Sequence, residues 1–329
     1  MQKIATLSPK DRSDLFTETA AVRGLSPAVI EKDFWTCWVL DMLFTSDFFK
    51  EKILFKGGTS LSKVFGLIER FSEDIDLILD WNEVVEESPE LERSKTKQDR
   101  FNKATNERAR AYLSDRFLPA VADLIDGVAT ASIDPQTPDV IDILYPGAFK
   151  ETYLRPEIRL EVGPLAAWLP NAEYAIRPYA AEVFPHLFET PDARVKAILA
   201  ERTFWEKATI LHQEAHRPPD KPQPPRYSRH YYDLVRMVQS DKKSVFLAST
   251  VLLPDVAAFK QKYYPSNWAR YDLAQIGTLK LVPPDHVVAT LKRDYAQMQI
   301  MIFGHAPEFE EILEVLKGLE TEINQGKVK

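Results

Sequence analysis

Residues 56–79, KGGTSLSKVFGLIERFSEDIDLIL, combine a glycine pair, two neighbouring hydroxyl residues and two aspartates separated by one isoleucine. ILF at 53–55 predicts a short buried strand that enters the glycines. A helix from Ser60 to Arg70 is predicted because apolar residues recur there with a 3.6-residue period: Leu61, Val64, Phe65 and Ile68. In DIDLILDW at 74–81, apolar residues recur at every second position and the aspartates lie between them, which predicts a half-buried strand. The stretch therefore predicts strand, tight turn, helix and strand.

The turn has the composition of a phosphate site. A glycine pair between a strand and a helix lets the backbone approach a phosphate closely, and the N-terminus of the following helix offers unpaired N–H groups and a positive dipole end. Hydroxyl donors follow the glycines, and a lysine precedes them. We therefore predict that a phosphate chain is bound by five residues: Lys56, Gly57, Gly58, Thr59 and Ser60.

The two aspartates are predicted metal ligands. Asp74 and Asp76 are two residues apart on a strand, so their carboxylates lie on one face. Mg²⁺ prefers a few carboxylates plus phosphate oxygens, and two such ions can stabilise the attacking and leaving oxygens of an in-line displacement. A neighbouring strand would supply a third carboxylate, for which Glu161 is the first candidate and Asp142 the second.

A simpler interpretation of the aspartates competes with this one. Acidic residues alternate with apolar ones on many exposed strands, and most such pairs bind nothing. The Gly-Gly-Thr-Ser turn upstream and the Ser-Glu-Asp at the mouth of the strand favour the metal interpretation, because a solvated strand requires neither. From the residues alone, both interpretations remain open.

The rest of the chain predicts an α+β protein with two domains. VIDILY at 140–145 and PEIRLEVG at 156–163 are further strand candidates, and Ser26-Pro27 predicts the start of an N-terminal helix. From about Thr190 the pattern becomes helical, broken by five prolines between Pro218 and Pro225. We predict an α/β domain with N-terminal helices over 1–190 and a mainly helical domain over 191–329.

Composition is typical of a folded protein: 45% of residues are apolar and 28% are charged. The lone Cys37 excludes an internal disulfide, the first twenty residues lack the apolar core of a signal peptide, and no apolar run approaches the roughly 18 residues that span a bilayer. These features predict a reduced, soluble, cytoplasmic protein with no membrane partner.

The net charge of −7 gives no global reason to expect nucleic-acid binding, but positive charge is concentrated locally. Eight Lys or Arg stand against three acidic residues between Arg93 and Arg116. That segment predicts either a phosphate-binding face or a solvated helix with i,i+4 ion pairs, and the run alone favours the second.

The sequence of residues 56–79 resembles the first motif of the AbiEii/AbiGii toxin branch of the nucleotidyltransferase superfamily, which has the DNA polymerase beta-like fold. Gly-Gly-Thr-Ser-Leu and Arg-Phe-Ser-Glu-Asp-Ile-Asp-Leu are hallmark strings of that branch. ERTFWEKATILH resembles its lysine motif and implies that Lys207 binds phosphate, while RHYYDL resembles its last motif and implies a catalytic role for Asp233. IEKDFW at 30–35 and EIRLEVGPLAAWLP are also similar, so the resemblance runs from about residue 25 to 240.

The residues alone explain these two positions without catalysis. Lys207 lies at the edge of an apolar helical stripe, as a surface lysine does, and Asp233 is spaced for helix ion pairs with Arg229 or Arg236. The string HQEAH at 212–216 puts His212 and His216 one turn apart but matches no zinc-protease motif. Interaction with the C-terminal dipole of the helix is the simpler explanation of these histidines.

Together, motifs and resemblance imply a Mg²⁺-dependent nucleotidyltransferase with catalytic residues Asp74, Asp76, Lys207 and Asp233. The resemblance implies a toxin of a toxin–antitoxin, abortive-infection system for phage defence, with a separately encoded antitoxin. It also implies transfer of a nucleoside monophosphate from an NTP to the 3′ end of tRNA, which would contact the basic 93–116 segment and the Arg217 to Arg229 loop. The alternatives are a protein or small-molecule acceptor, or a catalytically silent nucleotide- or RNA-binding module.

Overall fold

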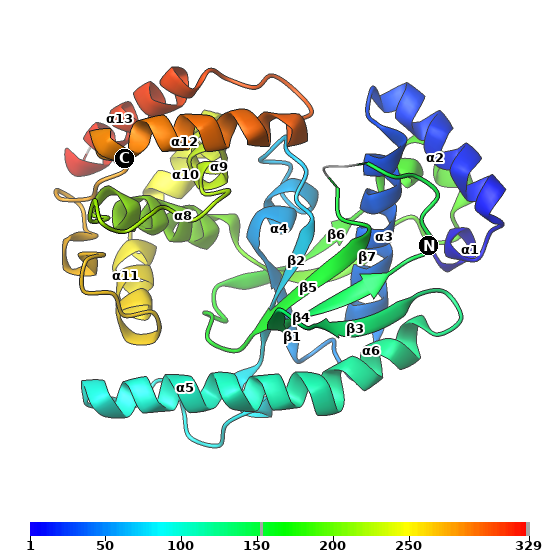
Figure 1. Cartoon of the computed structure of the whole chain (residues 1–329), viewed down its shortest axis with the longest axis horizontal. Coiled ribbons are helices and arrows are strands. Elements are labelled where there is room, and N and C mark those ends of the chain that lie inside the picture. The colour runs from blue at the N-terminus through cyan, green and yellow to red at the C-terminus, as the bar shows by residue number, and fades with distance from the viewer. Residues whose placement is uncertain (152–153, 327–329) are drawn as a thin grey trace. The chain divides into compact units, whose positions relative to one another are not determined.

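The structure, a computed structural model, describes residues 1–151 and 154–326. The chain folds into two compact units (Figure 1). Met1–Val64 and Ser72–Ile198 form the first unit; Phe65–Phe71 and the chain from Leu199 onward form the second. The predicted boundary after residue 190 therefore falls shortly before the end of the first unit. The short segment 65–71, which we call the excursion, leaves the first unit and returns just before the two aspartates.

A mixed seven-stranded sheet forms the centre of the first unit, as the α+β prediction required (Figure 1). Its strand order is β3-β4-β5-β2-β1-β7-β6. The strands are β1 (Ile53–Lys56), β2 (Asp74–Leu79), β3 (Thr130–Asp134), β4 (Thr137–Leu144), β5 (Glu157–Gly163), β6 (Asn171–Ile176) and β7 (Ala193–Ile198). Strands predicted at 53–55, 74–81, 140–145 and 156–163 are thereby confirmed. Since β2 pairs with β1 on one side and β5 on the other, it is an interior strand.

Strand β7 corrects one prediction, because residues 193–198 were expected to belong to a helix. Ala193, Val195 and Ala197 are buried while Arg194 is exposed, which is the two-residue period of a strand. The helix α8 begins only at Ala200. Pairing with β1 and β6 provides the hydrogen bonds that make this short alternation a strand.

The helix predicted from Ser60 to Arg70 is also wrong in extent. Helix α4 spans Gly57–Lys63, starting at the glycines themselves. Gly66 has φ +61°, a left-handed conformation that ends a helix, and the excursion continues without regular structure. The apolar period through Ile68 thus does not mark one helix, because Leu61 and Val64 belong to the first unit whereas Phe65 and Ile68 belong to the second.

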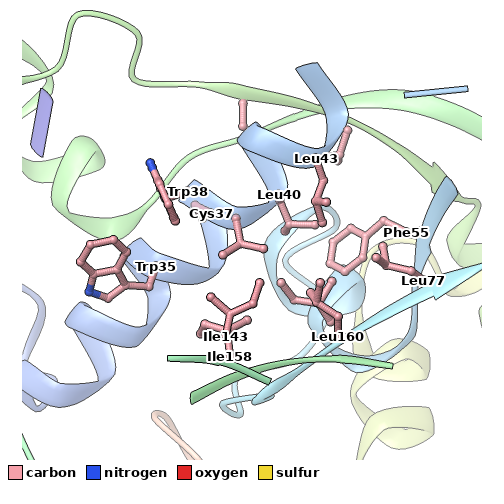
Figure 2. Packing of buried hydrophobic residues seen from close by; sticks show 14 of the residues in the cluster. Trp35, Cys37, Trp38, Leu40, Leu43, Phe55, Leu77, Ile143, Ile158 and Leu160 are labelled. Carbon is pink, nitrogen blue, oxygen red and sulfur yellow. The ribbon is translucent and has the colours of Figure 1, made fainter. Parts of the chain in front are cut away.

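One face of the sheet packs against α3 (Pro27–Thr45), which begins as predicted with Ser26 accepting a hydrogen bond from the Val29 amide. Figure 2 shows side chains of α3, among them Leu40 and Leu43, packed beside strand residues such as Phe55 and Leu160. The other helices of this unit are α1 (Gln2–Ala5), α2 (Pro9–Arg23), η1 (Trp81–Glu83), α5 (Lys95–Tyr112), η2 (Leu113–Phe117), α6 (Leu118–Ile125), α7 (Tyr179–Val183) and η3 (Pro185–Leu187).

The second unit is helical, in agreement with the prediction for the C-terminal part of the chain. Helices α8 (Ala200–Ala215) and α9 (Ser228–Gln239) pack together, and the proline-rich connection between them contains no helix. The remaining elements are α10 (Lys243–Ala248), α11 (Leu252–Tyr263), η4 (Tyr271–Leu273), α12 (Asp285–Met298), η5 (Gln299–Met301) and α13 (Phe309–Asn324). Within the described residues, no helix has the length and apolar character that a bilayer crossing requires.

Candidate functional site

Three of the predicted site residues share one row across the sheet. Asp76 on β2 pairs in register with Lys56 on β1 and with Glu161 on β5. Residues in register on neighbouring strands project from the same face, so a lysine and two carboxylates lie side by side. Asp74 lies on the same face one row away, with its side chain 23% exposed. The predicted grouping of Asp74, Asp76 and Glu161 on one face is therefore present in the strand register.

The backbone of Gly57 lies directly against the carboxylate of Asp76. A Cβ atom at position 57 would lie 1.9 Å from Asp76 Oδ2, and Gly57 has φ +83°. Both features require glycine, since only glycine lacks the Cβ and adopts this conformation without strain. The glycine turn and the aspartate strand, separated by 18 residues in sequence, are thus one packed structure.

The hydroxyl groups of Thr59 and Ser60 donate hydrogen bonds to backbone carbonyl oxygens of the protein. Thr59 Oγ1 donates to the carbonyl oxygen of Asp74, and Ser60 Oγ donates to the carbonyl oxygen of Gly57 at 2.9 Å. Both residues are buried. The Thr59 side chain therefore holds α4 to the start of β2, whereas the Ser60 hydroxyl bonds within α4, and the predicted role of both as phosphate donors stays a prediction.

We expect Gly57→Ala to abolish the nucleotidyl transfer that the resemblance implies, because the new Cβ would displace the Asp76 carboxylate. The positive φ adds roughly 1 kcal/mol of strain to the folded state and lowers the free energy of unfolding by that amount. Gly24→Ala is the matched control: Gly24 has φ +67° but nothing within 4 Å of its Cβ position. Rates of product formation and urea unfolding curves of both variants test this. Equal activity of the two variants would contradict it.

Arg159 is a site residue that the sequence analysis missed. It pairs in register with Asp74 on β2 and Asp142 on β4. Its guanidinium forms ion pairs with Asp134 at 3.0 Å, Asp142 at 3.6 Å and Asp74 at 3.8 Å. Asp142, the second candidate for a third carboxylate, is thus engaged by Arg159 one row away from Glu161. The alternation of β5, which puts Arg159 and Glu161 on one face, was the available signal.

The other two predicted catalytic residues meet in the second unit. Lys207 on α8 and Asp233 on α9 form an ion pair of 2.8 Å between Nζ and Oδ2. Arg70 of the excursion donates from Nε to Oδ1 at 2.6 Å and from Nη2 to Oδ2 at 2.7 Å. Asp233 is 0% exposed, and Arg70 and Lys207 are buried beside it. Asp233 therefore orients Lys207, whereas the helix ion pairs expected with Arg229 or Arg236 are replaced by these two partners.

The ionisation of this cluster follows from its neighbours. Burial by itself raises the pKa of Asp233, but the charges and hydrogen bonds of Arg70 and Lys207 outweigh burial and hold that pKa well below its usual value. Arg70 was not predicted as a partner because the excursion was expected to be a helix. The arginine that precedes Phe-Ser-Glu-Asp was the signal that could have found it.

The histidines of HQEAH have structural roles. The Lys280 amide donates to His212 Nδ1 at 3.0 Å, so Nε2 carries the proton and donates to the Arg270 carbonyl at 2.9 Å. Burial lowers the pKa of His212 to about 4, which keeps its ring neutral. His216 contacts the carbonyl of His212 through Nδ1 at 2.8 Å. His212 is therefore explained by hydrogen bonds to other segments, whereas His216 bonds a carbonyl in the last turn of α8, in keeping with the C-terminal interaction suggested from the sequence.

Comparison with solved structures gives distant similarities. The chain is 13% identical to MenT4, a nucleotidyltransferase toxin from Mycobacterium tuberculosis H37Rv, with a TM-score of 0.49, covering 96% of this chain and 99% of that one. It is 14% identical to a candidate nucleotidyltransferase from Helicobacter pylori, with a TM-score of 0.44, covering 92% of this chain and 97% of that one. No protein of curated function matches the sequence.

The family comparison covers most of the chain. Residues 38–315 match the family model described as "Nucleotidyl transferase AbiEii toxin, Type IV TA system". This range includes the glycine turn, the aspartate strand, Glu161, Lys207 and Asp233. The protein thus belongs to the AbiEii family of nucleotidyltransferase toxins of type IV toxin–antitoxin systems.

Proposed function

We propose that this nucleotidyltransferase transfers a nucleoside monophosphate from an NTP to the 3′-hydroxyl of a tRNA. The observation that carries the proposal is the row in which Asp76 lies between Lys56 and Glu161, against the backbone of Gly57. Carboxylates to hold a divalent cation and a lysine to face phosphate are the parts that phosphoryl transfer needs, because its catalysis consists mainly of positioning and charge stabilisation.

Mg²⁺ would be held by Asp74 and Asp76 together with phosphate oxygens of the NTP, and Glu161, in register with Asp76, is the candidate third carboxylate. The donors fit this ion, since Mg²⁺ takes oxygen ligands and commonly binds one or two carboxylates together with substrate phosphates. Across residues 1–151 and 154–326, no three His, Cys, Asp or Glu side chains are grouped so as to hold a metal by themselves. When bound, the ion would neutralise developing charge on the transferred phosphoryl group.

In the proposed reaction, the acceptor 3′-oxygen attacks the α-phosphorus of the NTP and the bond to the β-phosphate oxygen breaks. Pyrophosphate leaves with its electron pair, and the hydroxyl proton is lost to solvent or to a site carboxylate. Lys56 would offset phosphate charge, and the absence of side chains at Gly57 and Gly58 would let the triphosphate approach the backbone closely. Lys207, oriented by Asp233, is proposed to bind phosphate as well.

The proposed RNA contact is the exposed side of α5. Lys97, Arg100 and Arg108 are exposed, and within the described residues none of them forms an ion pair. The i,i+4 pairs that would explain these charges without RNA are therefore not formed. These residues also line a cavity of about 1010 Å³ beside the acidic segment 82–92. Arg217 of the second predicted contact is engaged by Glu214 at 2.6 Å, so the proposal relies on α5.

The test of the function is a labelling reaction. Purified protein is incubated with each α-labelled NTP, Mg²⁺ and total tRNA, and separately with cell lysate. The proposal expects label on tRNA, removed by 3′-terminal nuclease treatment, and none when EDTA replaces Mg²⁺. Label on a protein or small molecule would assign a different acceptor, and no label from any NTP would favour a silent binding module. The family also implies a separately encoded antitoxin, whose co-expression we expect to relieve any growth inhibition.

We expect charge reversal of Lys95, Lys97 and Arg100 to weaken tRNA binding and to reduce its salt dependence. Each lost phosphate contact lowers the slope of log K against log salt by roughly 0.7–0.9. Reversal of Lys10, Lys50 and Lys317, which lie outside α5, changes net charge equally and is the control. Filter binding at several salt concentrations measures both sets. An unchanged slope in the α5 variant would remove this helix from the RNA site.

A further inference from the structure

Three consecutive charged residues of α3 are buried. Glu31 and Lys32 are each 1% exposed and Asp33 is 3% exposed, within an otherwise apolar stretch of the helix. Burying a charge is costly unless it is paired and hydrogen-bonded. Each of the three residues has such partners, and each contacts a different segment of the first unit.

Lys32 contacts the residue before the first site aspartate. Its Nζ lies 3.4 Å from Glu73 Oε1 and donates to the Arg155 carbonyl at 2.7 Å. The Arg155 amide in turn donates to Glu73 Oε1 at 2.8 Å. Lys32, Glu73 and the backbone of Arg155 therefore form a closed group. Because Glu73 immediately precedes Asp74, this group holds the start of β2 against α3.

Asp33 contacts the last residue of α4. Its Oδ1 lies 2.7 Å from Lys63 Nζ, and its Oδ2 accepts a hydrogen bond from the Tyr179 amide at 2.7 Å. The ammonium of Lys63 also lies 4.0 Å from the ring centroid of Tyr179. With its side chain 7% exposed, Lys63 has little access to solvent, so this pair fixes the end of α4.

The two contacts lie where the chain leaves the first unit and where it returns to it. Lys63 is one residue before the first unit ends at Val64, and Glu73 is one residue after it resumes at Ser72. Between them lies the excursion, whose residues are bound in the second unit: the Phe71 amide donates to the Met301 carbonyl, and Arg70 binds Asp233. Adjacent residues of one helix thus hold the chain where it leaves the first unit and where it returns.

We propose that Lys32 and Asp33 are positioning residues of the transferase, which hold α4 and β2 in the mutual register that the site requires. The reason is the contact of Gly57 with Asp76: the turn and the strand belong to one site, yet the chain that joins them is bound elsewhere. Their register therefore depends on the β1–β2 ladder, on Thr59 and on the two anchors from α3. The inference rests on the proposed function for its activity readout.

The test uses Lys32→Met, Asp33→Asn and Glu73→Gln in the full chain. We expect kcat for labelling to fall about 10- to 100-fold, as small misplacements of reacting groups do, with KM for the NTP changed less than about twofold. The milder Asp33→Asn and Glu73→Gln keep side-chain shape and remain informative if Lys32→Met does not fold. Restoring charge with Glu73→Asp is expected to recover part of the kcat lost in Glu73→Gln.

Glu31→Ala is the matched control. Glu31 is as buried as Lys32, but it accepts its hydrogen bonds from the Ala148 and Phe149 amides, which belong to neither α4 nor β2. The substitution is expected to lower stability and leave kcat unchanged in the folded protein. If Glu31→Ala lowers kcat as much as the other variants do, or if kcat merely follows the folded fraction measured by urea titration, the positioning role is refuted.

Hydrogen exchange separates this inference from the proposed function. Amides of residues 57–61 and 74–77 are expected to exchange faster in Lys32→Met and Asp33→Asn than in wild type, and not in Glu31→Ala. This result requires no substrate, so it stands even if wild-type protein labels nothing. Unchanged exchange at both segments would overturn the anchoring itself.

Discussion

Asp76→Asn is expected to lower the rate of nucleotidyl transfer about 10³-fold or more while the protein remains folded. Asparagine keeps the shape of aspartate but lacks the charge that holds a divalent cation, and metal stabilisation of phosphoryl transfer is worth several kcal/mol. Asp76 lies at the centre of the row, between Lys56 and Glu161 and against Gly57. The measurement is single-turnover labelling at saturating NTP.

Asp80→Asn is the matched control for this change. Asp80 follows β2 on the same chain segment, but its carboxylate accepts a hydrogen bond from the Asn82 amide at 2.9 Å and so caps η1. Asparagine caps equally well, so wild-type rates are expected. If Asp76→Asn retains the activity of Asp80→Asn, these aspartates do not form the site.

Asp233→Ala is expected to lower the free energy of unfolding by about 3–5 kcal/mol. Removing one partner of a buried ion pair leaves uncompensated charge, and here two cations, Arg70 and Lys207, lose their shared carboxylate. The excursion is held in the second unit partly through this carboxylate, so the loss extends beyond the helix that carries Asp233. Urea unfolding at pH 7 measures the change, and the isosteric Asp233→Asn provides a second variant.

The contribution of Asp233 to the free energy of unfolding depends on pH in a predictable direction. The pKa of Asp233 lies below the value of about 3.9 in an unfolded chain, so the folded state binds its proton less readily. Its stabilising contribution is therefore complete above about pH 5 and is lost as pH falls further. The difference between wild type and Asp233→Ala should shrink at low pH. Asp272→Ala, which breaks the exposed pair with Arg270, should stay within about 0.5 kcal/mol of wild type.

Several elements could be predicted because their signal is local. The alternation of 74–79, the apolar run at 53–55 and the capped start at Ser26 each occur within a few residues. Two predictions of helix were wrong, at 193–198 and at 65–70, because the local apolar pattern there also fits a non-helical segment. Residues 193–198 are a strand because β1 and β6 pair with them. Residues 65–70 leave the helix because Gly66 is left-handed and because the excursion packs within the second unit.

The sequence by itself indicated the family through its motifs, and it predicted which residues share a turn or a strand face. Glycines after a strand and alternating aspartates can be placed by spacing alone, since backbone geometry sets their positions. Tertiary structure decided what surrounds them. That Gly57 touches Asp76, that Arg159 faces Asp74, and that Arg70 and Lys207 share Asp233 all depend on contacts between distant segments. Such contacts are set by strand pairing and burial, which no short spacing encodes.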